Sequence, residues 1–139
     1  HYDSVSNYSN NNMGLAHPLG AGFQEFIAIA RYQPLKKLYL QGKIMYYKQG
    51  QDTAGINFGN NILIDYRNRP TNYGWKIGAG NEATCFYTEA NAAYEIKENL
   101  FLDAGITLRN YSLASGTAQN TAIFNLGFRW NITKRTFDF

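Results

Sequence analysis

Residues 121–132 read Thr-Ala-Ile-Phe-Asn-Leu-Gly-Phe-Arg-Trp-Asn-Ile, and this stretch decides the fold class. From residue 124 onward its even positions are all apolar (Phe124, Leu126, Phe128, Trp130, Ile132), and its odd positions are polar or Gly (Asn125, Gly127, Arg129, Asn131). Successive side chains of a strand point to opposite faces of a sheet, so a period of two indicates a strand with one apolar face. A helical period would spread these aromatic rings around the whole circumference.

Four earlier segments alternate in the same way: residues 22–32, 38–49, 83–96 and 100–111. In the last of them, apolar positions (Leu100, Leu102, Ala104, Ile106, Leu108) alternate with Asp103, Gly105, Thr107 and Arg109. The first is the least regular, because Ile27 and Ile29 share a face with charged residues. Consecutive amphipathic strands predict an all-β, antiparallel up-and-down sheet.

The connections between the strands alternate in length. Residues 33–37 and 97–99 are short turns, residues 112–120 are a medium loop, and residues 50–82 are a long Gly- and Asn-rich segment. Long loops at one end and short turns at the other are typical of outer-membrane barrels, and strands of about 10 residues suit a tilted bilayer crossing. We therefore expect a transmembrane β-barrel with long extracellular loops and short periplasmic turns. Residues 1–21 would form an extracellular loop, and residues 22–139 would form about five C-terminal strands of a larger barrel.

The composition excludes several classes of protein. The chain has 139 residues, enough for one domain, and no apolar run near the length of a membrane-spanning helix. Its single cysteine excludes an intrachain disulfide and a cysteine-based zinc site. The net charge of +3 is scattered, without the basic stripe of a nucleic-acid-binding protein. His1 and His17 lie in predicted loops and no nucleophile motif is present, so we expect no enzyme activity, no catalytic residue, no metal and no cofactor.

The aromatic residues on the apolar face fall near the strand ends. If the short turns face the periplasm, Tyr32, Tyr94 and Trp130 gather at that end of the apolar face and form a periplasmic aromatic girdle. Tyr46, Phe86 and Phe124 fall on the same face toward the opposite end. The alternative is that these residues are simply good strand formers that pack in a soluble core.

The opposite face carries charges of both signs. These predicted lumen charges are Glu25, Arg31, Lys43, Glu89, Glu95, Asp103, Arg109 and Arg129. Opposite charges on neighbouring strands can pair, which favours a wet, self-neutralising barrel interior. The alternative function of such a face is a path for a substrate or an ion.

Three positions resemble signals of exported bacterial proteins. The terminal Phe139 follows the most regular strand and resembles the signal that the barrel-assembly machinery of outer membranes reads. Ser4 and Thr53 lie in Asp-Ser-Val and Asp-Thr-Ala tripeptides, which resemble an O-glycan acceptor motif of Bacteroidota. Ser4 and Thr53 are therefore candidate O-glycan sites.

Several segments together resemble the C-terminal part of a family of Bacteroidota outer-membrane proteins, the gliding-motility RemB-like and capsule-assembly Wzi-like barrels. They are residues 15–21, 31–35, 47–52, 61–63 and 128–132. The resemblance implies a non-enzymatic structural or accessory component of a cell-surface machine, for gliding motility or protein secretion. It also implies an outer-membrane location, with lipids, the barrel-assembly machinery and other outer-membrane proteins or lipoproteins as partners. Members of this family are much longer, so the chain would be a C-terminal portion.

Two other functions stay open at this point. The first is a porin-like or capsule-polysaccharide-binding barrel, whose lumen and long loops hold sugar. The second is a soluble lipocalin-like barrel that turns its apolar face inward to bind a small ligand.

The strand count makes a further prediction. Five strands of this length cannot close around a packed interior, and unpaired backbone groups are costly in lipid. We therefore expect residues 22–32 or 121–132 to have a free edge or to pair with another chain or segment. A five-stranded sheet closed on itself would contradict the barrel assignment.

Overall fold

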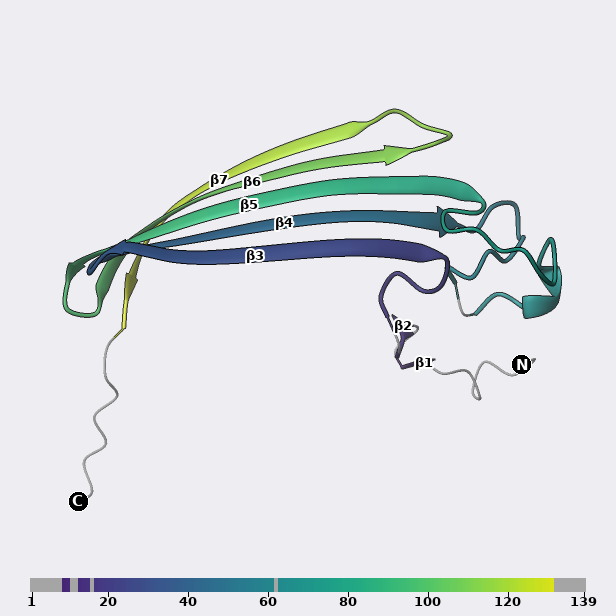
Figure 1. Cartoon of the computed structure of the whole chain (residues 1–139), viewed down its shortest axis with the longest axis horizontal. Helices are drawn as coiled ribbons and strands as arrows, with labels where there is room; N and C mark the ends of the chain where they lie inside the picture. Colours follow the sequence, from purple (N-terminus) through teal and green to yellow (C-terminus); the bar gives the residue numbers. More distant parts are fainter. Residues whose placement is uncertain (1–8, 11–12, 16, 62, 132–139) are drawn as a thin grey trace, which may run out of the picture. The chain divides into compact units, whose positions relative to one another are not determined.

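The computed structural model describes residues 9–10, 13–15, 17–61 and 63–131. Its main element is one sheet of five antiparallel strands in the order β3-β4-β5-β6-β7. The strands are β3 (Phe23–Leu35), β4 (Leu38–Gln51), β5 (Asn81–Lys97), β6 (Leu100–Leu113) and β7 (Gln119–Trp130). Figure 1 shows them side by side in sequence order, from blue β3 to yellow-green β7. The predicted all-β, up-and-down sheet is therefore confirmed.

The strands extend somewhat beyond the predicted segments. β5 begins at Asn81 and contains 17 residues, and β7 begins at Gln119, ahead of the predicted start at residue 121. The alternation of apolar and polar side chains weakens at these ends, but the backbone hydrogen bonds between the strands continue through Asn and Gln. Ile132, the predicted end of the last strand, lies outside the described residues.

The predicted N-terminal loop contains a short pair of strands. β1 (Ser9–Asn10) and β2 (Met13–Gly14) run antiparallel, with Ser9 opposite Gly14. This short pair lies within residues 1–21, the segment predicted to be a loop. Backbone hydrogen bonds need no apolar side chains, so a search for alternating hydrophobicity does not detect so short a pair.

The short turns lie together at one end of the sheet. The Glu95 N–H donates to the Lys37 carbonyl (2.8 Å), and the Asn131 N–H donates to the Asn99 carbonyl (2.9 Å). Asn99 adopts φ 62° in the turn between β5 and β6, a left-handed conformation that Asn tolerates better than most residues. The predicted turn at residues 97–99 is thus confirmed. The left-handed conformation at position 99 explains why an Asn occupies it.

By its contacts the chain divides into two compact units. The first holds the described parts of His1–Phe26, Met45–Phe86 and Asn110–Asn120, which include the long β4–β5 connection. The second holds those of Ile27–Ile44, Tyr87–Arg109 and Thr121–Phe139, which include the short turns. A 3-10 turn, η2 (Tyr66–Asn68), lies in the long connection, and Asp65 caps it by accepting the Arg67 N–H. No helix in the described part of the chain is long and apolar enough to cross a membrane.

The apolar face of the sheet is not covered by the described residues. Leu126, Phe124 and Phe128 are 78%, 75% and 75% exposed, although they belong to the most regular strand. The buried side chains in the described ranges are Ala83, Cys85 and Gln49. A sheet with one apolar face normally buries that face against another layer. The described residues form no such second layer over this face.

The sheet is open. β3 and β7 each pair with a strand on one side only, and they do not pair with each other. Both predicted edges are therefore free, as the strand count required.

Candidate functional site: the polar face and its cavity

Odd-numbered side chains of neighbouring strands contact one another across the polar face. The Arg31 Nε donates to Gln41 Oε1 (3.2 Å), which joins β3 to β4. Arg129 makes two hydrogen bonds to the Asp103 carboxylate, at 3.0 and 3.2 Å, which join β7 to β6. These contacts follow from the strand period, because directly opposed residues share a face.

A second group of contacts lies on the same face of β4, β5 and β6. The Glu89 carboxylate accepts hydrogen bonds from the Tyr87 hydroxyl (2.7 Å) and from the Asn91 amide (2.5 Å). The Lys43 ammonium lies 5.6 Å from the centre of the Tyr87 ring. The Phe101 ring sits 4.4 Å from the Arg129 guanidinium carbon, a distance at which cation–π attraction operates. The aromatic rings of Tyr87 and Phe101 on this face thus contact charged side chains instead of packing in an apolar core.

All the predicted lumen charges are engaged with neighbours. Besides the contacts above, Glu95 Oε1 accepts the Asn99 N–H at 3.2 Å, and Glu25 Oε2 lies 3.5 Å from His17 Nε2. Arg109 also interacts with a neighbouring group. Among these eight residues, Arg129 and Asp103 form an ion pair with each other, and most of the other contacts are with neutral polar or aromatic groups.

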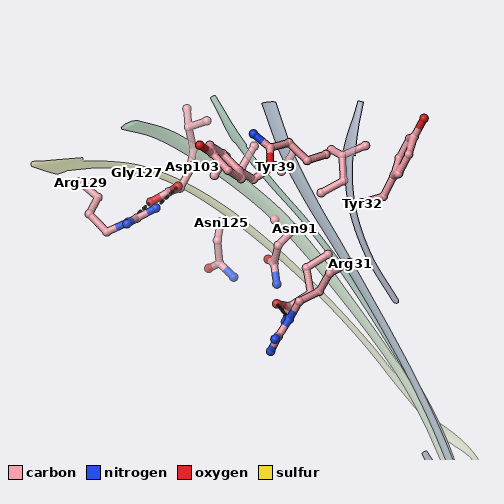
Figure 2. A pocket seen from close by; sticks show the side chains of 16 residues that line it. Arg31, Tyr32, Tyr39, Asn91, Asp103, Asn125, Gly127 and Arg129 are labelled. Atoms are coloured by element: carbon pink, nitrogen blue, oxygen red, sulfur yellow. Dashed lines mark hydrogen bonds and ion pairs between the residues drawn. The ribbon is translucent and has the colours of Figure 1, made fainter. Parts of the chain in front are cut away.

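The polar side of the second unit is hollowed into a cavity of about 660 Å³. Figure 2 shows Arg31, Asn91 and Asn125 projecting from three different strands on one side of the ribbons, beside the Arg129–Asp103 pair. Gly127 lines the cavity and has no atom within 4 Å of the place a Cβ would take. At Gly105, another lining residue, a Cβ would overlap the Asn91 amide oxygen. The two glycines therefore make room for the amides and for the cavity.

The cavity lining combines hydrogen-bonding groups with apolar ones. Its polar groups are amides, two guanidinium groups, one carboxylate and two tyrosines, and its apolar residues include Leu40, Ala92 and Leu126. No cluster of three or more potential metal ligands occurs within the described ranges. Such a lining can hold water, or can bind a polar solute whose hydrogen bonds to water are replaced by hydrogen bonds to side chains.

The opposite face carries the predicted girdle residues. Tyr32, Tyr94 and Trp130 are 67%, 46% and 67% exposed, and all three belong to the second unit. Phe86 and Tyr46 are half-exposed in the first unit. These five residues are thus only partly covered by the described residues.

Sequence reasoning missed how the long β4–β5 connection is organised. The Asp52 carboxylate accepts the backbone N–H groups of Phe58 (2.6 Å), Asn60 (3.4 Å) and Asn61 (2.7 Å). Buried Gln49 donates to the Leu19 carbonyl (2.7 Å). The signal that could have revealed this structure is the presence of Phe58 and Trp75, whose rings meet edge to face, in an otherwise polar segment.

Thr53, a predicted O-glycan site, lies at an exposed tight turn. It pairs with Ile56 across Ala54 and Gly55, whose φ angles are 51° and 78°. Because the turn presents the hydroxyl-bearing residue to solvent, we expect the peptide containing Thr53 to carry added hexose-type mass in material from the native organism. Mass spectrometry of the intact peptide checks this, and an unmodified mass would contradict it. Ser4 and Phe139 lie outside the described residues.

No protein-family model, curated protein or solved structure matches the chain.

Proposed function

We propose that the chain forms part of a transmembrane β-barrel in the outer membrane of a Gram-negative bacterium. In this role it is a non-enzymatic structural or accessory component of a cell-surface machine for gliding motility or protein secretion. The family resemblance supplies the biological process, and the two faces of the sheet support the membrane location.

The observation that carries the proposal is the exposure of a continuous apolar face beside a polar face that carries hydrogen-bonded charged side chains. Leu126, Phe128 and Trp130 on β7 project from the uncovered side, while Arg129 between them pairs with Asp103 on the other side. Soluble monomers rarely expose contiguous apolar patches larger than a few hundred Å². A lipid bilayer satisfies such a face without any further protein layer, as it does in outer-membrane barrels.

The two free edges fit the same proposal. β3 has 13 residues and β7 has 12, and each leaves one row of backbone groups unpaired. In lipid each unpaired group costs several kcal/mol, so both edges require partner strands. Further strands that close the sheet into a barrel would supply them.

A porin-like or polysaccharide-binding barrel is the second candidate. The polar cavity supports it, because amide and guanidinium groups are suitable partners for sugar hydroxyls or an anionic solute. A soluble lipocalin-like barrel is less well supported. It requires a ligand cavity enclosed by apolar side chains, whereas the cavity here also has Arg31, Asn91 and Asn125 in its lining.

Membrane residence has a direct test. We expect the protein to stay in the membrane fraction until detergent is added, because its apolar face needs a lipid or detergent cover. We also expect the unboiled protein to migrate faster than the boiled protein on a denaturing gel, since closed barrels resist unfolding. Recovery in buffer without detergent would contradict the proposal.

The two barrel functions can then be separated. Stable co-purification with other envelope proteins is the result expected of a machine component. Conductance in planar bilayers, or retention of a glycan through purification, would instead favour the porin-like or polysaccharide-binding barrel.

A further inference from the structure

The long connection between β4 and β5 helps to enclose a second cavity, here called the loop pocket. Its volume is about 480 Å³, and it lies entirely in the first unit. Its large apolar lining residues are Phe23, Phe58, Trp75 and Ile77, and its basic ones are Lys76 and Arg69. The Arg69 Nε donates a hydrogen bond to Asn72 Oδ1 (2.8 Å), so Arg69 is already engaged within the chain. This volume falls within the range of small-molecule sites, which combine apolar walls with few polar groups.

The walls of the loop pocket are held in place before any ligand arrives. The Ala21 N–H donates to the Gly59 carbonyl (2.7 Å), and the Gly78 N–H donates to the Gly22 carbonyl (3.0 Å). The rings of Phe58 and Trp75 meet edge to face, with centroids 6.1 Å apart. These contacts connect the β4–β5 connection to the start of β3. A ligand that binds in the loop pocket therefore has to order few residues of the chain.

The charge of the loop pocket is one-sided. None of the described residues that line it is acidic. Asp52 accepts the backbone N–H groups of Phe58 and Asn61, and Asp65 pairs with Arg67, so neither carboxylate forms an ion pair with Lys76. Lys76 forms no ion pair within the described part of the chain. The pocket therefore offers a positive charge beside an apolar surface.

Neutral sugars suit this lining poorly. A sugar ring needs several hydrogen-bond partners, and the lining amide of Asn57 already uses one of its two N–H groups and one of its two acceptor sites within the chain. Its Nδ2 donates to the Ile64 carbonyl (2.9 Å), and its Oδ1 accepts the Gly59 N–H (2.7 Å). A ligand with a compact apolar body and a single anionic group uses the walls and the Lys76 ammonium without needing those amide atoms.

We propose that the loop pocket binds a small amphiphilic anion, with its apolar body against Phe23, Phe58 and Trp75 and its anionic group toward Lys76. The inference does not depend on the proposed membrane function, since every residue used belongs to the first unit.

The test uses tryptophan fluorescence of the full polypeptide in a non-ionic detergent. Trp75 and Trp130 are the 2 tryptophans of the chain, so Trp130→Phe leaves a reporter in the loop pocket and Trp75→Phe leaves one on the apolar face. Naphthalene-2-sulfonate is the anionic probe, and naphthalene-2-sulfonamide is its neutral counterpart. Glucuronate is added in a third titration, as an anion with a polar body.

We expect saturable quenching of Trp75 by naphthalene-2-sulfonate, with weaker binding of the sulfonamide. In the Trp130→Phe background, Lys76→Gln is expected to weaken sulfonate binding about 2- to 5-fold, the size expected of one partly solvated ion pair. The matched control Lys36→Gln removes an exposed lysine from a short turn in the other unit and should leave the affinity unchanged. The Trp130 reporter measures partitioning of the probe into detergent and should show no saturation.

Three results would overturn the inference. The first is equal affinity for the sulfonate and the sulfonamide, and the second is the same quenching at Trp75 and Trp130. The third is saturable binding of glucuronate without binding of the sulfonate, which would assign the pocket to an acidic sugar instead.

Discussion

Leu126→Arg is expected to destabilise the protein in lipid vesicles by about 2–4 kcal/mol, the cost of a cation on the lipid face of a barrel near the bilayer midplane. Leu126 lies in the middle of β7 and is 78% exposed. In buffer, an exposed position of this kind would tolerate Arg within about 0.5 kcal/mol. The large effect therefore appears only if hydrocarbon covers this face. Guanidinium unfolding of the protein refolded into vesicles measures it.

Asn125→Arg is the matched control for this prediction. Asn125 is the preceding residue of β7, so its side chain lies on the opposite face from Leu126, the face of Arg129, where a guanidinium group can stay hydrated. We expect Asn125→Arg to cost far less than Leu126→Arg. Equal losses at the two positions would mean that the faces of β7 are assigned wrongly.

Gly50→Ala is the second large effect expected, with a loss of up to about 3 kcal/mol, the range of overpacking in a closely packed region. Gly50 is buried at the end of β4, and a Cβ there would collide with the Ala79 backbone carbonyl. A backbone atom cannot rotate away as a side chain can, so the chain around Ala79 must move. That movement would strain the hydrogen bonds that Gly50 and Gly78 both donate to the Gly22 carbonyl, at 3.3 and 3.0 Å.

Gly42→Ala provides the comparison within the same strand. Nothing lies within 4 Å of the position that its Cβ would take, so we expect a change within about 0.5 kcal/mol. Chemical unfolding measures both variants, and limited proteolysis of residues 52–80 should show faster cleavage only in Gly50→Ala. Similar stabilities of the two variants would contradict the close approach of residues 50 and 79.

The five strands, their order and the polarity of their faces could be predicted from the sequence. The period of two is a local property, visible within each segment such as residues 121–132, and it needs no knowledge of distant residues. The tight turn at Asn99 could be predicted for the same reason, because the conformational tolerance of Asn is intrinsic. The free edges of β3 and β7 followed from the number of strands alone.

The organisation of the β4–β5 connection was decided only by the tertiary structure. Asp52 binds backbone N–H groups up to nine residues away, and Gln49 reaches the Leu19 carbonyl thirty residues earlier in the chain. Backbone amides are the same for every non-proline residue, so no sequence pattern marks which of them a carboxylate will bind. The loop pocket likewise joins Phe23 at the start of β3 to Phe58 and Trp75. That meeting depends on how the chain returns to the sheet, because neither segment alone has a periodicity that requires it.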